Sequence, residues 1–113
     1  MTKAKAGDYN FDCPITYTLL ILEGKWKWLI IWVLSEEGTL RYGELKKLLP
    51  DITHKMLSQQ LKAMEKMQLV LRKVFNQIPP KVEYSLTKKG STLLPIIDRM
   101  CEWGEKNCPA KNK

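Results

Sequence analysis

The alternation of apolar and polar positions predicts a mainly helical protein with one hairpin. Before residue 39, apolar residues recur every three or four positions in two stretches, which is the spacing of a helix face. The first expected helix begins at Pro14, because proline suits the first helical position, and it ends at Gly24. The second, within Lys25–Gly38, is apolar almost all round. We therefore expect it at the centre of the core, with its tryptophans packed there.

A pair of helices joined by a short turn follows. The stretch Thr39–Pro50 predicts a very short extended piece and then a third helix, which Pro50 ends. A fourth helix begins after Thr53, a residue type that caps helix N-termini. Because only the turn PDI separates the two helices, they are predicted to form a helix-turn-helix.

Two segments rich in branched and aromatic residues, Leu69–Asn76 and Lys81–Thr87, predict strands. The sequence QIPP lies between them, and its prolines pair poorly in a sheet, so it marks the tip of a hairpin. A last helix is expected from about Lys88 to Asn107, capped by Thr87, with Pro95 kinking or locally breaking it.

This order of elements predicts a winged helix-turn-helix, an α+β fold that is mainly α. In such a fold the second helix of the pair enters the major groove, and the hairpin, or wing, touches the flanking backbone. The extra N- and C-terminal helices are expected to form a dimer interface. The 113 residues suit one domain, at 13–110, preceded by a flexible arm at 1–12.

Composition narrows the class of protein. No stretch approaches the roughly 20 apolar residues that cross a bilayer, and the N-terminus lacks the apolar middle of a signal peptide. We therefore expect a cytoplasmic protein with no membrane partner. The three cysteines form no CxxC pair and no Cys/His cluster with zinc spacing. We expect neither a structural metal nor another cofactor.

The positive charge is concentrated in one segment. The net charge is +7; residues 1–50 carry 7 basic and 6 acidic groups, whereas residues 52–90 carry 8 basic and 2 acidic groups. A basic face of this kind suits a polyanion such as double-stranded DNA, the alternative being a merely solubilising surface.

The fourth helix divides into a core edge and a polar face. At 100° per residue, Leu57, Leu61 and Met64 lie within about 40° of one another and form the core edge. Gln60 is half turned toward the core, whereas Gln59 points outward. Amides, hydroxyls and lysines can read base edges, and carboxylates, which repel phosphates, are scarce. The alternative is an exposed helix of ordinary polar residues. The residues expected to meet DNA are Thr53, His54, Lys55, Met56, Ser58, Gln59 and Lys62.

The wing supplies further candidates for phosphate contacts, which position a protein without reading sequence. These are Lys73, Asn76, Gln77 and Lys81, with Lys81 placed to reach a phosphate from the rigid tip. Arg41 and Lys25 are weaker candidates, and for each lysine alone the alternative is simple solvation. No group of residues supports nucleophilic or acid/base catalysis, so we do not expect an enzyme. His54, the only histidine, has no second ligand nearby in sequence for a metal.

The chain resembles the HxlR-type family of bacterial winged-helix transcription regulators over nearly its whole length after the arm. The matching stretches are CP at 13–14, GKWKWLI at 24–30, LRYGELKKLLPDITHKMLSQQLKAME at 40–65, IPPKVEYSLTKKG at 78–90 and LLPIIDRMCEWGE at 93–105. The resemblance implies a small homodimer whose terminal helices pair and whose recognition helices read an inverted repeat. The chain departs from the family at two positions. The family usually has a Gln-like residue where His54 stands, and often Asn or Ser where Gly43 stands.

The resemblance also draws attention to Cys13, because some relatives use a cysteine at this position to sense oxidants, quinones or aldehydes. Cys13 precedes Pro14, and a helix N-terminus favours a thiolate, although Asp12 opposes this. The alternative is a buried structural cysteine or a bystander. Cys101 falls among apolar residues and is expected to pack, whereas Cys108 is a candidate resolving partner.

Dimer contacts are expected along an apolar stripe of the last helix, with help from the first. The candidates are Leu19, Leu22, Leu93, Ile97, Met100, Cys101, Trp103 and Gly104. Two other functions stay open: a regulator that responds to a small molecule without cysteine chemistry, and a winged-helix module that binds proteins.

Overall fold

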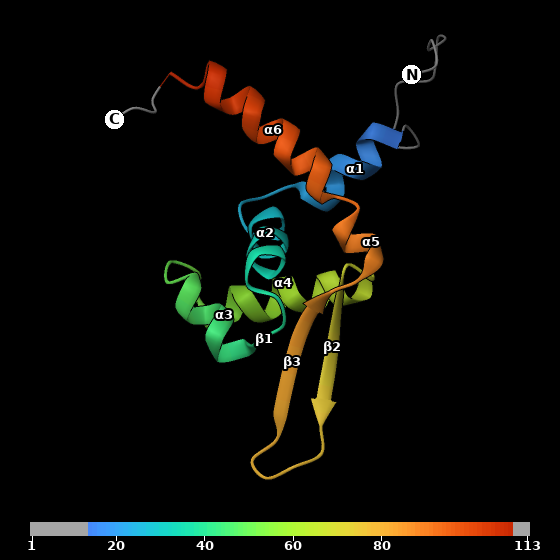
Figure 1. Ribbon diagram of the computed structural model, residues 1–113, viewed down its shortest axis with the longest axis vertical. Coiled ribbons are helices and arrows are strands. Elements are labelled where there is room, and N and C mark those ends of the chain that lie inside the picture. Colours follow the sequence, from blue (N-terminus) through green and yellow to red (C-terminus); the bar gives the residue numbers. More distant parts are fainter. Residues whose placement is uncertain (1–13, 110–113) are drawn as a thin grey trace.

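The computed structural model describes residues 14–109, so the expected N-terminal arm and Cys13 lie outside the described part. The order of elements is that of a winged helix-turn-helix, which confirms the predicted fold class (Figure 1). The elements are α1 (Pro14–Leu22), α2 (Lys27–Glu37), β1 (Leu40–Arg41), α3 (Tyr42–Leu48), α4 (His54–Lys66), β2 (Val70–Phe75), β3 (Lys81–Leu86), α5 (Lys88–Ser91) and α6 (Leu94–Asn107).

Helix α2 lies at the centre, as predicted, and α1, β3, α5 and α6 pack against it (Figure 1). Its side chains Ile30 and Ile31 are completely buried, because an apolar helix surface is stable only when other elements cover it. Trp26 and Trp32 pack against the core from its edge. The expectation for Trp28 was wrong: this side chain is 39% exposed, since α2 has one side that no described element covers.

The sheet has three antiparallel strands in the order β1-β3-β2. The central strand β3 pairs Tyr84 with Leu40 of β1 on one side and with Arg72 of β2 on the other. Tyr84 is buried, whereas the outer half of the hairpin extends beyond the core, as Figure 1 shows. The hairpin is therefore anchored at its base and presents its tip to the surroundings.

The predicted last helix is two helices, α5 and α6, separated by Thr92 and Leu93. Thr87 caps α5, with its Oγ1 accepting from the N–H of Gly90 at 2.9 Å, as predicted. Pro95 lies in the first turn of α6, a position where proline fits and no helical hydrogen bond is lost. The proline therefore begins a new helix, which leaves the body of the molecule (Figure 1).

Within residues 14–109, no helix combines the length and the apolar character needed to cross a bilayer.

Candidate nucleic-acid interface

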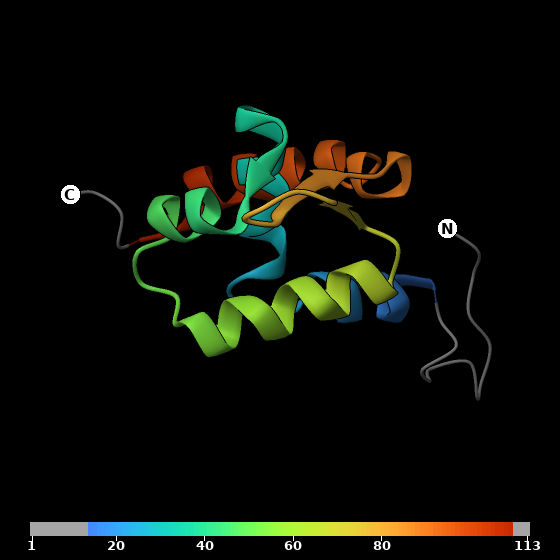
Figure 2. The same cartoon turned by 90° about the horizontal axis from the view of Figure 1, so that it is seen from below.

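The first turn of α4 is fixed by its cap. The hydroxyl of Thr53 accepts a hydrogen bond from the N–H of Met56 at 3.0 Å, which satisfies one of the free donors at a helix start. Thr53 is thus confirmed as the N-cap. Seen from below in Figure 2, α4 runs along the border of the molecule, and the turn from α3 leads into its first residues. The cap therefore sets where the exposed first turn points.

The two faces of α4 are those that its sequence predicts. Leu57, Leu61 and Met64 are buried. The residues of the opposite face are exposed: His54, Lys55, Ser58, Gln59, Lys62 and Lys66. None of the lysines on this face forms an ion pair with a described residue. The exposed face is thus rich in donors and in positive charge that no nearby carboxylate neutralises.

Adjacent glutamines point to different environments, as expected. Gln59 is exposed, whereas Gln60 is half-buried and its Nε2 lies 3.4 Å from the sulfur of Met56. Met56 is itself half-buried against the core. Part of its side chain is therefore turned away from the exposed face, and the expected contact of Met56 with DNA stays a prediction.

A tyrosine that was not predicted from the sequence as a site residue contacts two side chains of the exposed face of α4. The hydroxyl of Tyr42, at the start of α3, lies 3.0 Å from Nδ1 of His54 and 3.3 Å from Oγ of Ser58. The rings of Tyr42 and His54 are stacked, with centroids 5.8 Å apart. The sequence contains one hint that Tyr42 contacts α4: tyrosine has an apolar ring and a polar hydroxyl, and this tyrosine stands at the beginning of the preceding helix. Its partners depend on how α3 and α4 pack.

The lysines of the wing gather around another unpredicted residue, Phe75. Nζ of Lys81 lies 4.5 Å from the centre of its ring, and Nζ of Lys73 lies 5.1 Å from it. Lys81 also pairs with Glu83 at 3.5 Å, and its side chain is only 25% exposed. A carboxylate and a ring thus hold the ammonium group of Lys81 against the strand, and the expected contact of Lys81 with a phosphate stays a prediction.

The other candidates around the wing are exposed. Lys73, Asn76 and Gln77 present their side chains at or near the end of the hairpin. Arg41 is exposed at the inner end of the wing, opposite Glu83 in the register of β1 and β3. Lys25 is not part of the wing: it lies between α1 and α2, over the ring of Trp26, with Nζ 4.9 Å from the ring centre. The wing thus extends the basic surface of α4 along a second element.

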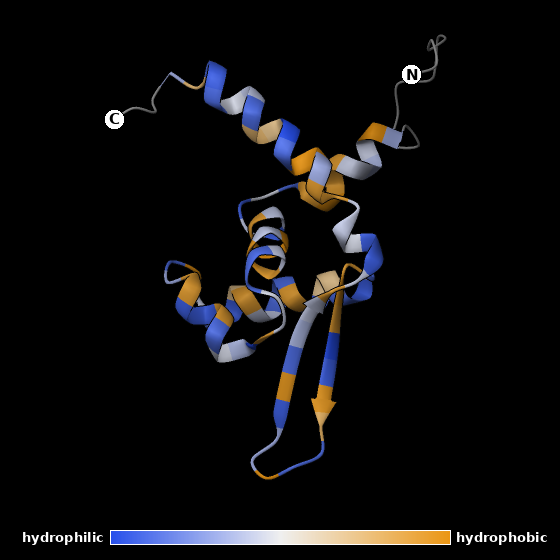
Figure 3. Ribbon diagram, in the orientation of Figure 1, coloured by the Kyte–Doolittle hydropathy of each residue, from blue (hydrophilic) through white to orange (hydrophobic). Residues whose placement is uncertain are grey.

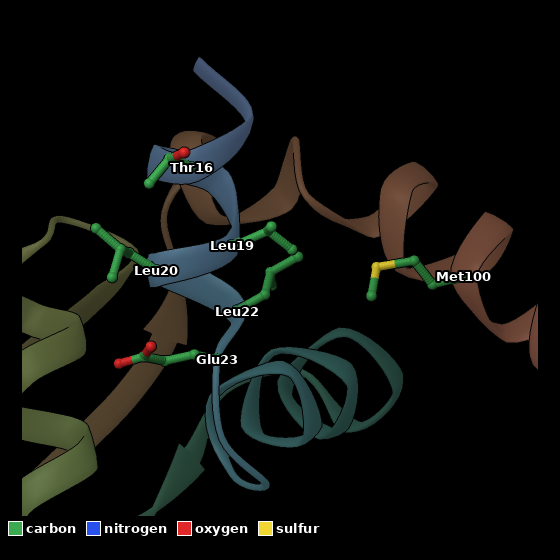
Figure 4. Close-up of a pocket in the computed structure, with 6 residues that line it drawn as sticks. All are labelled: Thr16, Leu19, Leu20, Leu22, Glu23 and Met100. Atoms are coloured by element: carbon green, nitrogen blue, oxygen red, sulfur yellow. The ribbon is translucent and has the colours of Figure 1, made fainter. Parts of the chain in front are cut away.

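A groove separates α1 from α6, on another part of the molecule. It has a volume of about 280 Å³, and Leu19 and Leu22 point across it toward Met100 (Figure 4). In Figure 3 the hydrophobic colours gather where α1 meets the start of α6. The exposed large apolar side chains of α6 are Ile96, Met100 and Trp103, and Trp103 is 69% exposed. This face has the composition of a surface that another molecule covers.

Three of the expected dimer residues have a different place in the single chain. Leu22, Leu93 and Ile97 are buried in the core of the protomer, because α1 and the base of α6 both pack on α2. They therefore do not offer free surface to a partner. Leu19 is exposed and Gly104 is half-buried, and both remain candidates, together with the exposed Met100, Cys101 and Trp103.

The expected packing of Cys101 was wrong. The side chain is exposed on α6, as is Cys108 just beyond the helix. The reason is that α6 extends past the elements that would cover it (Figure 1). In the described part of the chain, no group of three or more His, Cys, Asp or Glu residues is arranged to hold a metal ion.

Comparison with known proteins identifies helix-turn-helix proteins in each case. The family model described as HxlR-like helix-turn-helix matches residues 21–112. An uncharacterized HTH-type transcriptional regulator of Halalkalibacterium halodurans is 54% identical over 96 residues, which are 85% of this chain and 85% of that protein. Another from Bacillus subtilis, YdzF, is 52% identical over 93 residues, 82% of this chain and 85% of that one.

Two solved structures are similar in fold as well as in sequence. The redox regulator HypR in its oxidized form is 45% identical, with a TM-score of 0.76 over 84% of this chain and 97% of that chain. The reduced form of the transcriptional regulator YodB from B. subtilis is 35% identical, with a TM-score of 0.77 over 88% of this chain and 98% of that chain.

Proposed function

The chain belongs to the HxlR-like helix-turn-helix family of DNA-binding transcriptional regulators, which are not enzymes, and on that premise we propose that it binds a specific operator as a homodimer. The operator is an inverted repeat, and each protomer places α4 in the major groove of one half-site. Occupying the operator would then control access of polymerase to a promoter.

The observation that carries this proposal is the exposed polar face of α4. Lys55, Gln59 and Lys62 project from one side of a helix whose opposite side is buried. Glu65 is the single carboxylate of α4, so few groups repel phosphate oxygens. Glutamine pairs with adenine and lysine with guanine, each good bidentate pair contributing about 1–3 kcal/mol of discrimination. Gln59 is thus the strongest candidate for base reading.

The wing supports the proposal as a second contact with the DNA backbone. Lys73, Asn76 and Gln77 are exposed beside or at the hairpin tip, where a duplex seated on α4 would continue. Such contacts fix register without selecting bases. Lys81 would have to leave Glu83 to join them, so its contribution to affinity is expected to be smaller than that of Lys73.

The exposed apolar face of α6 supports the dimer. Met100 and Trp103 leave a large apolar surface uncovered on the single chain, and Leu19 of α1 faces the same groove. A second copy related by a two-fold axis would cover both faces with the same residues. Two-fold symmetry in the protein requires two-fold symmetry in the operator.

Selection of bound sequences from a random duplex pool tests the proposal. Recovery of an inverted repeat supports sequence-specific binding, the dimer and its symmetry together. Binding of all sequences alike, with no enriched site, contradicts it. A protein-interaction module would bind duplex DNA without the steep salt dependence that phosphate contacts cause.

A response to oxidants or electrophiles through Cys13 is the candidate for regulation. It is supported by the similarity to HypR, whose name identifies it as a redox regulator, and Cys13 itself lies outside the described residues. In this proposal, modification of Cys13 changes the angle between the two α4 helices through the dimer helices. Cys13→Ser should bind operator equally with and without an oxidant or quinone, whereas wild type should not.

A small-molecule inducer is the alternative, favoured by the groove between α1 and α6. A regulator of that kind would keep its full response after Cys13, Cys101 and Cys108 are all replaced by serine. Loss of the response in this triple variant, together with its loss in Cys13→Ser, would instead support cysteine sensing.

A further inference from the structure

The hydroxyl of Tyr42 contacts three groups of α4 at once. Its oxygen lies 3.0 Å from Nδ1 of His54, 3.2 Å from the carbonyl oxygen of His54 and 3.3 Å from Oγ of Ser58. The tyrosine ring packs against the core and stacks on the imidazole at an interplanar angle of 19°. The hydroxyl is therefore a fixed point against which the exposed side chain of His54 is held.

Only one placement of the hydrogens makes all three contacts hydrogen bonds. A tyrosine hydroxyl has a single hydrogen to donate, and its oxygen also accepts. The carbonyl of His54 can only accept, so the hydroxyl donates to it, and Nδ1 of His54 and Oγ of Ser58 donate to the tyrosine oxygen. With the hydroxyl hydrogen directed at Nδ1 instead, the contact with the carbonyl would join two oxygens without a hydrogen between them.

We propose that Tyr42 is a positioning residue that keeps the hydrogen of the His54 ring on Nδ1, so that Nε2 reads a base as an acceptor. The inference rests on the proposed function, since it requires α4 to enter the major groove. Because Nδ1 is held by Tyr42 and the side chain is exposed, Nε2 is the ring nitrogen that faces a ligand. A neutral imidazole with its hydrogen on Nδ1 has an acceptor at Nε2.

An acceptor at this place distinguishes between bases. In the major groove, adenine and cytosine present amino groups, N6 and N4, that donate to an acceptor. Guanine presents the acceptors N7 and O6, and thymine presents O4 and a methyl group. His54 is thus expected to select adenine or cytosine at one position of each half-site. Ser58, which donates to the same hydroxyl, is held in place and is less free to read a base.

The position of the ring hydrogen can be measured without DNA. His54 is the only histidine of the chain, so ¹⁵N-labelled protein gives one pair of imidazole nitrogen signals. At a pH where the ring is neutral, we expect the signal of Nδ1 to be that of a protonated nitrogen and the signal of Nε2 that of an unprotonated one. Tyr42→Phe keeps the packed ring and removes the hydroxyl, so it should yield a mixture of the two forms. A wild-type ring with its hydrogen on Nε2 overturns the proposal.

The reading role is tested by selection from random duplexes with wild type, Tyr42→Phe, His54→Ala and the double variant. Wild type should prefer adenine or cytosine at one position of each half-site. Each single variant should lower that preference about two- to twelvefold, the range that one hydrogen bond contributes. The double variant should lower it no further, because Tyr42 acts through His54. The control is Tyr17→Phe, which removes a tyrosine hydroxyl from α1 and should leave the preference unchanged.

The possible failures are distinguishable. A preference for guanine or thymine at that position, or an unchanged preference in His54→Ala, overturns the reading role while sequence-specific binding itself stands. A wild type that enriches no site overturns the proposed function, and the reading role with it. Equal binding of all variants to a non-specific duplex shows that a lost preference is not a loss of folding.

Discussion

The hydroxyl of Thr87 donates to the carbonyl oxygen of Gln68 at 2.6 Å, which joins the start of α5 to the loop that ends α4. The same oxygen accepts from the N–H of Gly90 at 2.9 Å. The side chain of Thr87 therefore caps a helix and also provides a donor for a loop carbonyl. The residue that carries this carbonyl, Gln68, has a positive φ of 64°. The loop that follows the helix expected to read DNA and the start of α5 meet at this contact.

Thr87→Ala is expected to lower the free energy of unfolding by about 1–2 kcal/mol, because it removes an N-cap and leaves a carbonyl without its donor. Urea unfolding followed by circular dichroism measures the change. Thr87→Ser should restore most of it. Ser91→Ala is the matched control: its hydroxyl bonds back to the backbone carbonyl of the N-cap residue, four positions earlier, so its removal should be nearly neutral. Equal losses in the two alanine variants would contradict the bridging role.

Gly90→Ala is expected to destabilise the fold by about 1–3 kcal/mol, because the added methyl group would collide with the backbone oxygen of Leu69. The melting temperature measures this effect. Gly43→Ala serves as the control, since a methyl group there meets nothing within 4 Å. An alanine in helix α3 should be neutral or slightly stabilising. A Gly90→Ala protein as stable as wild type would show that the backbone of α5 has room to move.

Gln59→Ala and Gln60→Met are expected to act on different properties. The first should relax base preference at particular operator positions and leave stability unchanged, because Gln59 is exposed. At Gln60 the buried Oε1 has no partner among the described residues, and such an atom costs about 1–3 kcal/mol. Gln60→Met should therefore raise the melting temperature. Selection from duplex pools and thermal unfolding, applied to both positions, measure the two effects; a reversed assignment would contradict the reading of the helix faces.

Trp103→Glu is expected to convert the proposed dimer into monomers, because a carboxylate would replace a large exposed apolar side chain on α6. Sedimentation velocity over a range of concentrations measures the oligomeric state. Trp28→Gln is the control, since Trp28 is also exposed but belongs to α2. Should both variants and wild type sediment alike as monomers, α6 does not pair.

Lys73→Gln is expected to weaken binding to all sequences alike and to reduce the salt slope of log K by about 0.9, the value for one phosphate contact. Fluorescence anisotropy with an operator duplex at several salt concentrations measures this slope. Lys81→Gln should change it less, since Lys81 is paired with Glu83. The control is Lys106→Gln, near the end of α6, which should leave the slope unchanged. A larger effect at Lys81 than at Lys73 would mean that the ion pair opens on DNA.

Much of the fold could be predicted because its signals are local. The Thr53 cap, the core edge of α4 and the strands on either side of the prolines depend on residues close in sequence. Periodicity alone separates Gln59 from Gln60. The exposed side of α4 was predictable for the same reason.

The contacts that sequence did not reveal join distant residues. Tyr42 lies 12 positions before His54, and their distance depends on how α3 crosses α4. The burial of Leu93 and Ile97, and the exposure of Cys101, depend on where α6 leaves the core. Periodicity identifies the apolar residues along one side of a helix. It does not identify the point along the helix beyond which other elements no longer cover these residues. The pairing of Lys81 with Glu83 is by contrast a local contact, because alternate residues of a strand share one face of β3.

The break at Thr92 and Leu93 makes α6 a lever. Its base packs on α2 and its 14 residues span about 21 Å. A tilt of about 10° at the break would move the far end by about 4 Å, close to the roughly 3.4 Å between successive bases of one DNA strand. In the proposed homodimer, small rotations at these two residues would therefore be large enough to change the spacing of the two α4 helices relative to the turns of a duplex.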